Sequence, residues 1–319
     1  MSHLIGVLGP TATGKSALGL AVAERINGEI INCDSTAVYR GLDIGTDKVP
    51  VAERRGIPHH LVDIVDPTNE YTAAAYGRDA AAVVRDILAR GRVPIVVGGT
   101  GFYFRALTRG LFPGPGKDDV LREHLNRIAD RRGVDFLWRM VKRVDVPSAA
   151  RIEPRDRKRL VRALEVFFQT GRPLTEHFAR TVSPLGPDVT VVAIAVTLPR
   201  PALAERLARR VDAQFAAGLL DEVRGALARG VPPDARPFTG LVYRQVLDYL
   251  RGVRDLAATR ALIVQENRRY ARRQLIWFRK EPNLMWFAGP GESPDVQASV
   301  LSWLAEQGLL PDGGPAAHA

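Results

Sequence analysis

Short apolar runs alternate with amphipathic stretches along the first hundred residues. Continuous apolar runs of strand length occur at Leu4–Leu8, at 29–34 ("EIINCD") and at 93–99 ("VPIVVGG"). Between them, Ser16–Ile26 and Ala73–Arg90 repeat apolar residues at helical spacing. Strands that alternate with helices in this way predict a parallel sheet covered by helices.

The pattern changes after the segment "FPGPGKDD". From about Asp118 to Arg180 the chain is helical in pattern and rich in both charges, before "DVTVVAIAVTL" returns to a strand pattern. Amphipathic helices follow Pro201, and the last of them is strongly basic and ends "RRYARRQLIWFRK". We therefore predict a core of 1–117 plus 185–304, a helical insertion at 118–184, and a disordered Gly/Pro/Ala-rich tail at 305–319.

Composition adds a preference for acidic partners. The net charge is +10 and the pI is about 10.1, which favours polyanions such as nucleic acid but also suits a solvated, Arg-rich surface. With Cys33 as the single cysteine, no intrachain disulfide can form, so a reducing cytoplasm is the expected location. No apolar run reaches the roughly 18 residues of a membrane helix, and the N-terminus has no basic segment typical of a signal peptide.

A phosphate-binding loop follows the first predicted strand. Residues 9–16, "GPTATGKS", match G-x-x-x-x-G-K-[ST] and lead into a predicted helix, which is the context the motif requires. Backbone N–H groups and the helix N-terminus would face an anion, Lys15 would reach the terminal phosphates, and the Ser16 hydroxyl would reach Mg²⁺. The motif predicts a P-loop NTPase-like α/β fold: a parallel sheet core flanked by helices, with an inserted all-helical domain. It does not distinguish ATP from another diphosphate or triphosphate.

Two more signals stand at the carboxyl ends of predicted strands, where open α/β sheets bind ligands. Asp34 follows the second strand, and its carboxylate suits either a magnesium or proton-transfer role or a plain turn cap. Thr100, in "VGGTGFY", follows the third strand and would present a hydroxyl to the same crevice. Cys33 is expected to be buried, and His59 and His60 to be structural.

Six segments in order resemble the bacterial tRNA dimethylallyltransferases, also called tRNA isopentenyl transferases. They are "GPTATGKS", "DSTAVYRGLDIGT", "PHHLVD", "VGGTGFYFRAL", "ARIEPRDRKRLVRALEVFFQTG" and "YARRQLIWFR", and they span about Gly6 to Arg279. The resemblance implies transfer of a dimethylallyl group from dimethylallyl diphosphate to N6 of adenosine 37 in tRNAs that read codons beginning with U. The loop would then hold a prenyl diphosphate, with Mg²⁺ as cofactor.

The resemblance also implies roles for individual residues. Asp34 would take the proton from the adenine amine, while Lys15 and Thr100 would stabilise the leaving diphosphate. The residues of the diphosphate loop would be Gly9, Pro10, Thr11, Ala12, Thr13, Gly14, Lys15 and Ser16, with Ser16 also binding the metal. Contacts to tRNA, in the anticodon stem-loop, would come from Asp34, Ser35, Thr36, Ala37, Thr100, Arg122, Lys158, Arg159, Leu160, Val161 and Arg162. The protein is expected to act as a monomer.

This chain departs from the family at two places. Thr36-Ala37 stand where the family usually has Met-Gln, so a side chain able to bond the target base is replaced by a methyl group. In "LVYRQ", Val242 stands where the family tends to have glycine, which bears on the local turn.

Three other functions remain open on the residues alone. A small-molecule or nucleotide kinase would use the loop for ATP and bind it without RNA. A non-catalytic RNA-binding protein would bind tRNA without transfer. An enzyme acting on free adenine nucleotides would need neither the helical insertion nor the basic C-terminal helix.

Overall fold

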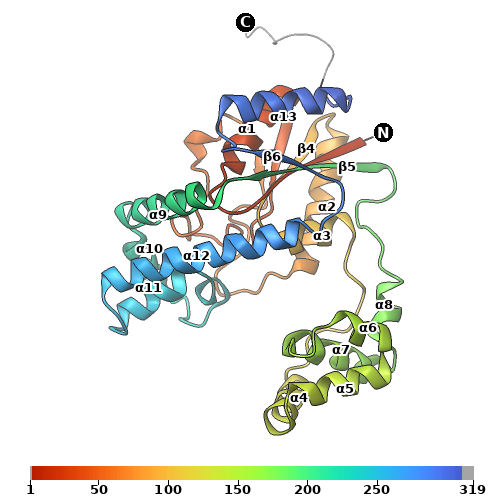
Figure 1. The fold of residues 1–319 in the computed structure, drawn as a ribbon. Helices are drawn as coiled ribbons and strands as arrows, with labels where there is room; N and C mark the ends of the chain where they lie inside the picture. The colour runs from red at the N-terminus through yellow and green to blue at the C-terminus, as the bar shows by residue number, and fades with distance from the viewer. Residues whose placement is uncertain (1, 311–319) are drawn as a thin grey trace, which may run out of the picture. The chain divides into compact units, whose positions relative to one another are not determined.

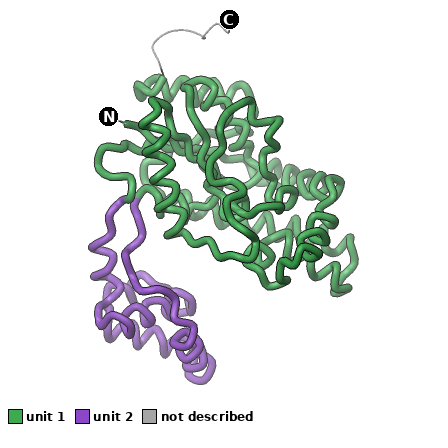
Figure 2. The backbone as a smooth tube through the Cα atoms, turned by 180° about the vertical axis from the view of Figure 1, so that it is seen from behind, with its two compact units in different colours: residues 1–108, 184–319 green, residues 109–183 purple. Residues whose placement is uncertain are grey.

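The chain folds into two compact units (Figure 2). The computed structural model describes residues 2–310. Unit 1 contains the residues up to Thr108 and those from Pro184 onward, and unit 2 is Arg109–Ser183. The insertion therefore begins earlier than the predicted residue 118. The reason is that Gly110 packs on Val182, and the Phe112 ring packs on His177 and Phe178, so the leading segment belongs with unit 2.

Unit 1 is built on a six-stranded parallel sheet with the order β3-β2-β4-β1-β5-β6. The strands are β1 (Ser2–Leu8), β2 (Gly28–Asn32), β3 (His59–His60), β4 (Val93–Gly98), β5 (Val189–Thr197) and β6 (Leu284–Ala288). This confirms the predicted parallel α/β fold. Because β2, β4 and β1 are adjacent and parallel, the loops that follow them lie together at the carboxyl end of the sheet.

Helices cover both faces of this sheet (Figure 1). On one face, α2 (Ala73–Ala89), α3 (Gly101–Thr108) and Phe278 pack against Leu4 and Leu8. On the other, α1 (Lys15–Ile26) and α13 (Pro294–Glu306) pack against Ile5 and Val7. The alternation of Leu4, Ile5, Val7 and Leu8 between the two cores is the period of two that a strand imposes on its side chains.

A third core of unit 1 lies beside the sheet. It is formed by α9 (Arg200–Ala216), α10 (Leu219–Ala228), α11 (Tyr243–Leu250), the 23-residue α12 (Leu256–Phe278), and Val38, Tyr39 and Leu42 from the segment after β2. Short 3₁₀ turns lie at Val51–Glu53 and Arg236–Thr239. This core holds the segment after β2 close to the ends of the strands.

Unit 2 is helical, with its own core. Its helices are α4 (Asp119–Arg132), α5 (Val134–Val144), α6 (Val146–Arg151), α7 (Arg157–Thr170) and α8 (Leu174–Phe178). The Asp118 side chain caps α4 by accepting a bond from Leu121 N at 2.9 Å. Leu125, Leu137, Val141 and Leu164 form the centre of its core.

Two C-terminal elements were not predicted. Edge strand β6 is five residues long, and α13 covers the sheet beside α1. The predicted tail began too early: residues 305 and 306 complete α13, and Leu309 and Leu310 pack against the second core. The rest of that prediction lies outside the described residues. Among the helices described here, none has the length and apolar character needed to cross a membrane.

Candidate functional site

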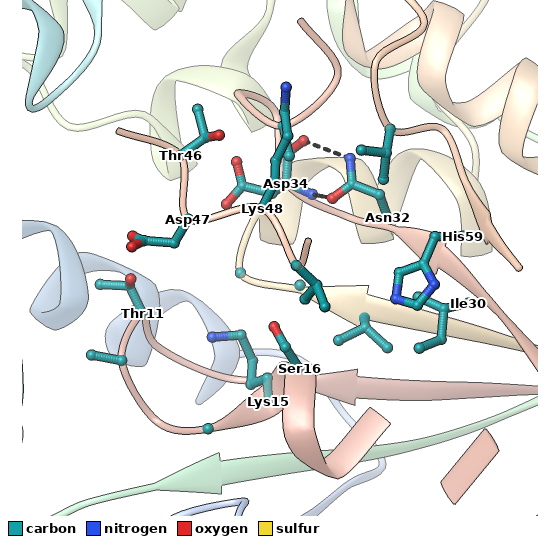
Figure 3. A pocket seen from close by; sticks show the side chains of 18 of the residues that line it. Thr11, Lys15, Ser16, Ile30, Asn32, Asp34, Thr46, Asp47, Lys48 and His59 are labelled. Carbon is teal, nitrogen blue, oxygen red and sulfur yellow. Dashed lines mark hydrogen bonds between the residues drawn. The ribbon is translucent and has the colours of Figure 1, made fainter. Parts of the chain in front are cut away.

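Residues 9–14 form a tight loop after β1, and Lys15 and Ser16 are the first two residues of α1 (Figure 3). Gly9 and Gly14 have φ values of 140° and 83°, and a Cβ on either would overlap Val196 or the Glu292 carboxylate. The loop also bonds to itself: the buried Thr13 hydroxyl and the Lys15 amine both donate to the Pro10 carbonyl, at 2.9 and 2.5 Å. The first turn of α1 points its unpaired N–H groups into this loop, as anion-binding helices do.

The loop is prepared for negative charge. Burial, followed by the nearby Arg210, lowers the pKa of Lys15 from 10.5 to about 7, against a smaller opposing effect of Asp34. A bound diphosphate would supply the missing negative charge and restore the proton. Ser16 is exposed at the second position of α1, so its hydroxyl is open to a ligand.

Asp34 is held by its main chain and by one of its two carboxylate oxygens. The Asn32 side chain accepts from Asp34 N and donates to Asp34 O, both at 3.0 Å. Oδ1 accepts from Thr36 N at 2.8 Å and from the Thr36 hydroxyl at 2.6 Å. Within the described chain Oδ2 accepts no hydrogen bond, so this oxygen remains open to a proton or a ligand. The turn-cap and proton-transfer roles considered for Asp34 thus fall on different oxygens.

Thr100 lies beside Asp34. Its Oγ1 accepts from Ser35 N at 3.1 Å, and its N–H donates to the Cys33 carbonyl at 3.0 Å. Tyr270 lines the same cavity as Asp34, and burial, followed by the Asp34 charge, raises the pKa of its phenol. The structure therefore brings Ser35 and Thr100 together next to Asp34, although Thr100 is not among the residues that line the cavities at this site.

Two cavities meet at Asp34. The first, of about 270 Å³, is lined by the phosphate loop, by Lys15 and by an apolar wall of Ile30, Ala37, Val49, Val62 and Val97. The second, of about 420 Å³, is lined by Ser35, Thr36 and Tyr270 and by residues of α11 and α12. Asp34, Thr11, Thr46 and Arg210 line both cavities. A carboxylate between a phosphate-binding cavity and a second cavity can act on a group held in either.

Several residues of this site carry no sequence signal of their own. Arg210, on α9, donates to Thr11 Oγ1 at 2.6 Å and ion-pairs with Asp47, which also accepts from the buried Gln214 at 2.8 Å. Arg206 donates to Ala12 O at 2.8 Å. These contacts join segments that are far apart in the chain, so local patterns cannot reveal them. Asp47 is a loop residue that lines the first cavity.

The predicted tRNA contacts of unit 2 divide into exposed and internal residues. Lys158 and Arg159 are exposed, whereas Leu160 and Val161 are buried in the core of unit 2. This narrows the predicted contact segment, because buried side chains cannot reach an RNA.

Arg122 and Arg162 are partly exposed and belong to an ion-pair cluster within unit 2. Both bind the fully buried Glu165, at 2.8 and 2.6 Å. Burial alone would raise the pKa of Glu165, but hydrogen bonds from Arg122, the Asp118 N–H and Arg162 outweigh it and lower the pKa. Their guanidinium groups therefore already have a structural partner.

Other residues expected to be structural have partners consistent with that role. Cys33 is buried, and burial raises the pKa of its thiol to about 12, so it is a poor nucleophile. His60 bonds Glu29 at 2.6 Å. His59 lines the first cavity, with Nδ1 against Ile57 O at 2.9 Å. In residues 2–310 no three His, Cys, Asp or Glu side chains are grouped to hold a metal ion.

Comparison with known proteins gives a consistent result. The family model described as IPP transferase matches residues 37–281. The tRNA dimethylallyltransferase of Solibacter usitatus is 45% identical over 303 residues, covering 95% of this chain and 98% of its own length. That of Geobacter metallireducens is 43% identical over 302 residues, covering 95% and 97%.

Solved structures agree. The tRNA isopentenylpyrophosphate transferase of Bacillus halodurans superposes with a TM-score of 0.71 at 34% identity, covering 97% of this chain and 98% of its own. A eukaryotic dimethylallyltransferase, in crystallographic snapshots of its action on tRNA, superposes with a TM-score of 0.76 at 26% identity, covering 96% and 79%. With its phosphate loop, its Asp34–Thr100 pair and these matches over nearly its whole length, the chain belongs to the IPP transferase family of tRNA dimethylallyltransferases.

Proposed function

We propose that the protein transfers a dimethylallyl group from dimethylallyl diphosphate to N6 of adenosine 37 in tRNAs that read codons beginning with U. The observation that carries the proposal is the place of Asp34, with its open Oδ2, where the phosphate-binding cavity meets the second cavity. A donor in one cavity and an acceptor in the other would meet at this carboxylate.

The first cavity suits the donor. Its phosphate loop offers N–H groups and Lys15 to a diphosphate, and its apolar wall of Ile30, Val49, Val62 and Val97 suits a branched hydrocarbon. ATP would place a polar ribose and base where the cavity offers these apolar side chains. The lining therefore favours a prenyl diphosphate over the kinase alternative.

The proposed reaction is a single displacement at C1 of the donor. The N6–C1 bond forms, the bond from C1 to the bridging oxygen breaks, and the N6 proton passes to Asp34 Oδ2. An exocyclic adenine amine is a poor nucleophile, so removal of its proton by a positioned base is worth about 10²–10⁴ in rate. Lys15 and the loop N–H groups stabilise the negative charge on the leaving diphosphate.

Magnesium fits this arrangement as a partner of the diphosphate. Mg²⁺ prefers oxygen ligands and is commonly held by one or two protein groups plus substrate phosphates. The exposed Ser16 hydroxyl is such a group, and the described residues offer no closed site of three acidic, His or Cys side chains. When bound, the ion would neutralise charge on the diphosphate.

The second cavity suits a base taken out of the RNA. Adenosine 37 must leave the anticodon stack to reach the donor, as bases do in other modifying enzymes. Tyr270 offers a ring to such a base, and Arg273, whose guanidinium lies 5.7 Å from the centre of that ring, lines the same cavity. The exposed Arg268, Arg269 and Arg272 of α12 would contact tRNA phosphates.

We also propose that the enzyme acts as a monomer, because one chain lines both cavities. We propose the cytoplasm as its location.

The test is product analysis. The protein would be incubated with Mg²⁺, dimethylallyl diphosphate and an unmodified tRNA transcript bearing A36-A37-A38, and the digested RNA analysed by mass spectrometry. We expect N6-dimethylallyladenosine at position 37, with the mass of one added dimethylallyl group, and no such product in a matched transcript with G37. ATP turnover without RNA would favour a kinase, tRNA binding without product a non-catalytic RNA-binding protein, and product from free AMP an adenylate-directed enzyme.

A further inference from the structure

Gln274 joins two loops of the active site. It is a buried residue of α12, and both ends of its side-chain amide are occupied. Oε1 accepts from the N–H of Thr11 in the phosphate loop at 2.9 Å, and Nε2 donates to the carbonyl of Gly99 at 2.8 Å. These partners follow β1 and β4, which are neighbours in the sheet, so one side chain spans the gap between the two loops.

The fit between α12 and the second of these loops is tight. A Cβ on Gly99 would overlap Gln274 Nε2, and one on Gly101 would overlap the Trp277 ring. Between the two glycines stands Thr100, whose hydroxyl accepts from Ser35 N beside Asp34. Gln274 and Trp277 therefore lie directly against the turn that presents Thr100.

The same helix also reaches the second cavity. Glu266, Asn267, Tyr270 and Arg273 line that cavity, while Gln274 lines the first. Each polar end of Gln274 already makes a hydrogen bond to the backbone of one of the two loops. Its contribution to the site is therefore to hold the two loops in position relative to each other.

We propose that Gln274 is a positioning residue: it ties the phosphate loop to the Thr100 turn and so sets the distance between the leaving diphosphate and Asp34. This rests on the proposed function, since it assigns the donor to the phosphate loop. Loss of the bridge frees the Thr11 N–H and lets the loop shift relative to Asp34. Small displacements of reacting groups reduce rates strongly, so both donor binding and the chemical step should suffer.

Two substitutions test the bridge. Gln274→Leu has similar size but cannot bond either loop, and we expect about a tenfold weaker affinity for dimethylallyl diphosphate, measured by calorimetry without RNA, and a lower kcat. Affinity for tRNA should stay within about twofold of the wild-type value. In Gln274→Glu, the protonated carboxyl reproduces one acceptor and one donor, whereas the carboxylate repels the Gly99 carbonyl. Its kcat/KM relative to wild type, measured at each pH, should therefore rise as the pH falls from 8 to 6.

Gln265→Glu is the matched control, because it makes the same change at an exposed position on the opposite side of the same helix, about two and a half turns before Gln274. It should leave donor affinity unchanged at every pH. The proposal is overturned if Gln274→Leu keeps donor affinity and kcat within twofold of wild type, or if the Gln274→Glu ratio does not change with pH. If wild-type protein binds the donor but transfers nothing, the proposed function fails, and the donor affinities of the variants still decide the role of Gln274.

Discussion

At the scale of single residues, charge and open hydrogen-bonding capacity concentrate where the two cavities meet. Asp34 uses Oδ1 to hold its own turn and leaves Oδ2 open. Lys15 lies in the adjoining loop with its pKa lowered to about 7, chiefly by burial and then by Arg210. The charged form of Lys15 is therefore disfavoured, and a bound diphosphate would stabilise it.

Lys15→Met should stabilise the empty protein and abolish its use of the donor. Between pH 7 and 10.5 the unfolded chain, whose lysine has the ordinary pKa, binds more protons than the folded protein, so wild-type stability rises with pH. The stability advantage of Lys15→Met should thus be greatest at pH 7 and below and shrink toward pH 9. Thermal unfolding at several pH values measures this, and calorimetry should show at least tenfold weaker donor binding. A variant that is less stable than wild type at pH 6 would contradict the account.

Local motifs predicted the phosphate loop, Asp34 and Thr100, because each stands next to a strand end that its own neighbours reveal. Arg210 and Gln274 could not be predicted, since they bond Thr11 from 199 and 263 residues away in the chain. For Val242 the sequence predicted part of what the structure shows. It begins α11 at a φ of 48°, which β-branched residues rarely adopt, so the sequence departure does mark a position suited to glycine.

At the scale of elements, the segment after β2 is held by a helix rather than by the sheet. Glu222 of α10 accepts from the N–H groups of three successive residues, Asp43, Ile44 and Gly45, and from the Tyr243 hydroxyl at 2.8 Å. The residues that follow, Thr46 and Asp47, line the first cavity. The loop is therefore positioned by the third core of unit 1.

Glu222→Gln should lower the free energy of unfolding by about 2 kcal/mol. Hydrogen bonds to a charged carboxylate are replaced by weaker ones, and the NH₂ group of the new side chain would face a backbone N–H that needs an acceptor. Chemical denaturation measures the loss, and the KM for the donor should rise with it. Asp221→Asn is the control. The Asp221 carboxylate is next to Glu222 in the chain and forms only an exposed ion pair with Arg224, which contributes less than about 1 kcal/mol to stability. Equal effects of the two substitutions would argue against this role of Glu222.

Periodicity predicted the long elements well and the C-terminal ones poorly. The predicted helices Ser16–Ile26 and Ala73–Arg90 differ from α1 and α2 by one residue each. Strand β6 has only five residues on a sheet edge, of which Leu284, Trp286 and Phe287 are only partly buried, so it lacks the continuous apolar run of a central strand. Its pairing with β5 is set by tertiary packing.

At the scale of the whole molecule, the candidate active site and the helical insertion belong to different units. The phosphate loop, Asp34 and both cavities belong to unit 1, whereas Glu165 and its two arginines belong to unit 2. Each unit has its own core, so substitutions in unit 2 can be tested without disturbing the donor site.

The exposed cations of unit 2 and the arginines paired with Glu165 should behave differently. The double variant Lys158→Ala, Arg159→Ala should weaken tRNA binding and reduce the salt dependence of log K by about two, with no loss of stability. Arg122→Ala should instead destabilise unit 2 by about 3 kcal/mol, because it removes a partner of a buried carboxylate. Binding at several salt concentrations, and hydrogen exchange of residues 119–170, distinguish the two. Unchanged exchange in Arg122→Ala would mean that its contact with Glu165 is not structural.

The most direct test of the account is Asp34→Asn, which keeps the shape of the side chain and its bonds to Thr36 but cannot take a proton. Donor and tRNA affinities should stay within a fewfold of wild type, while the single-turnover rate of transfer should fall by about 10²–10⁴. Such a result would place Asp34 in the chemical step. A rate within tenfold of wild type would contradict the assignment of Asp34 as the base.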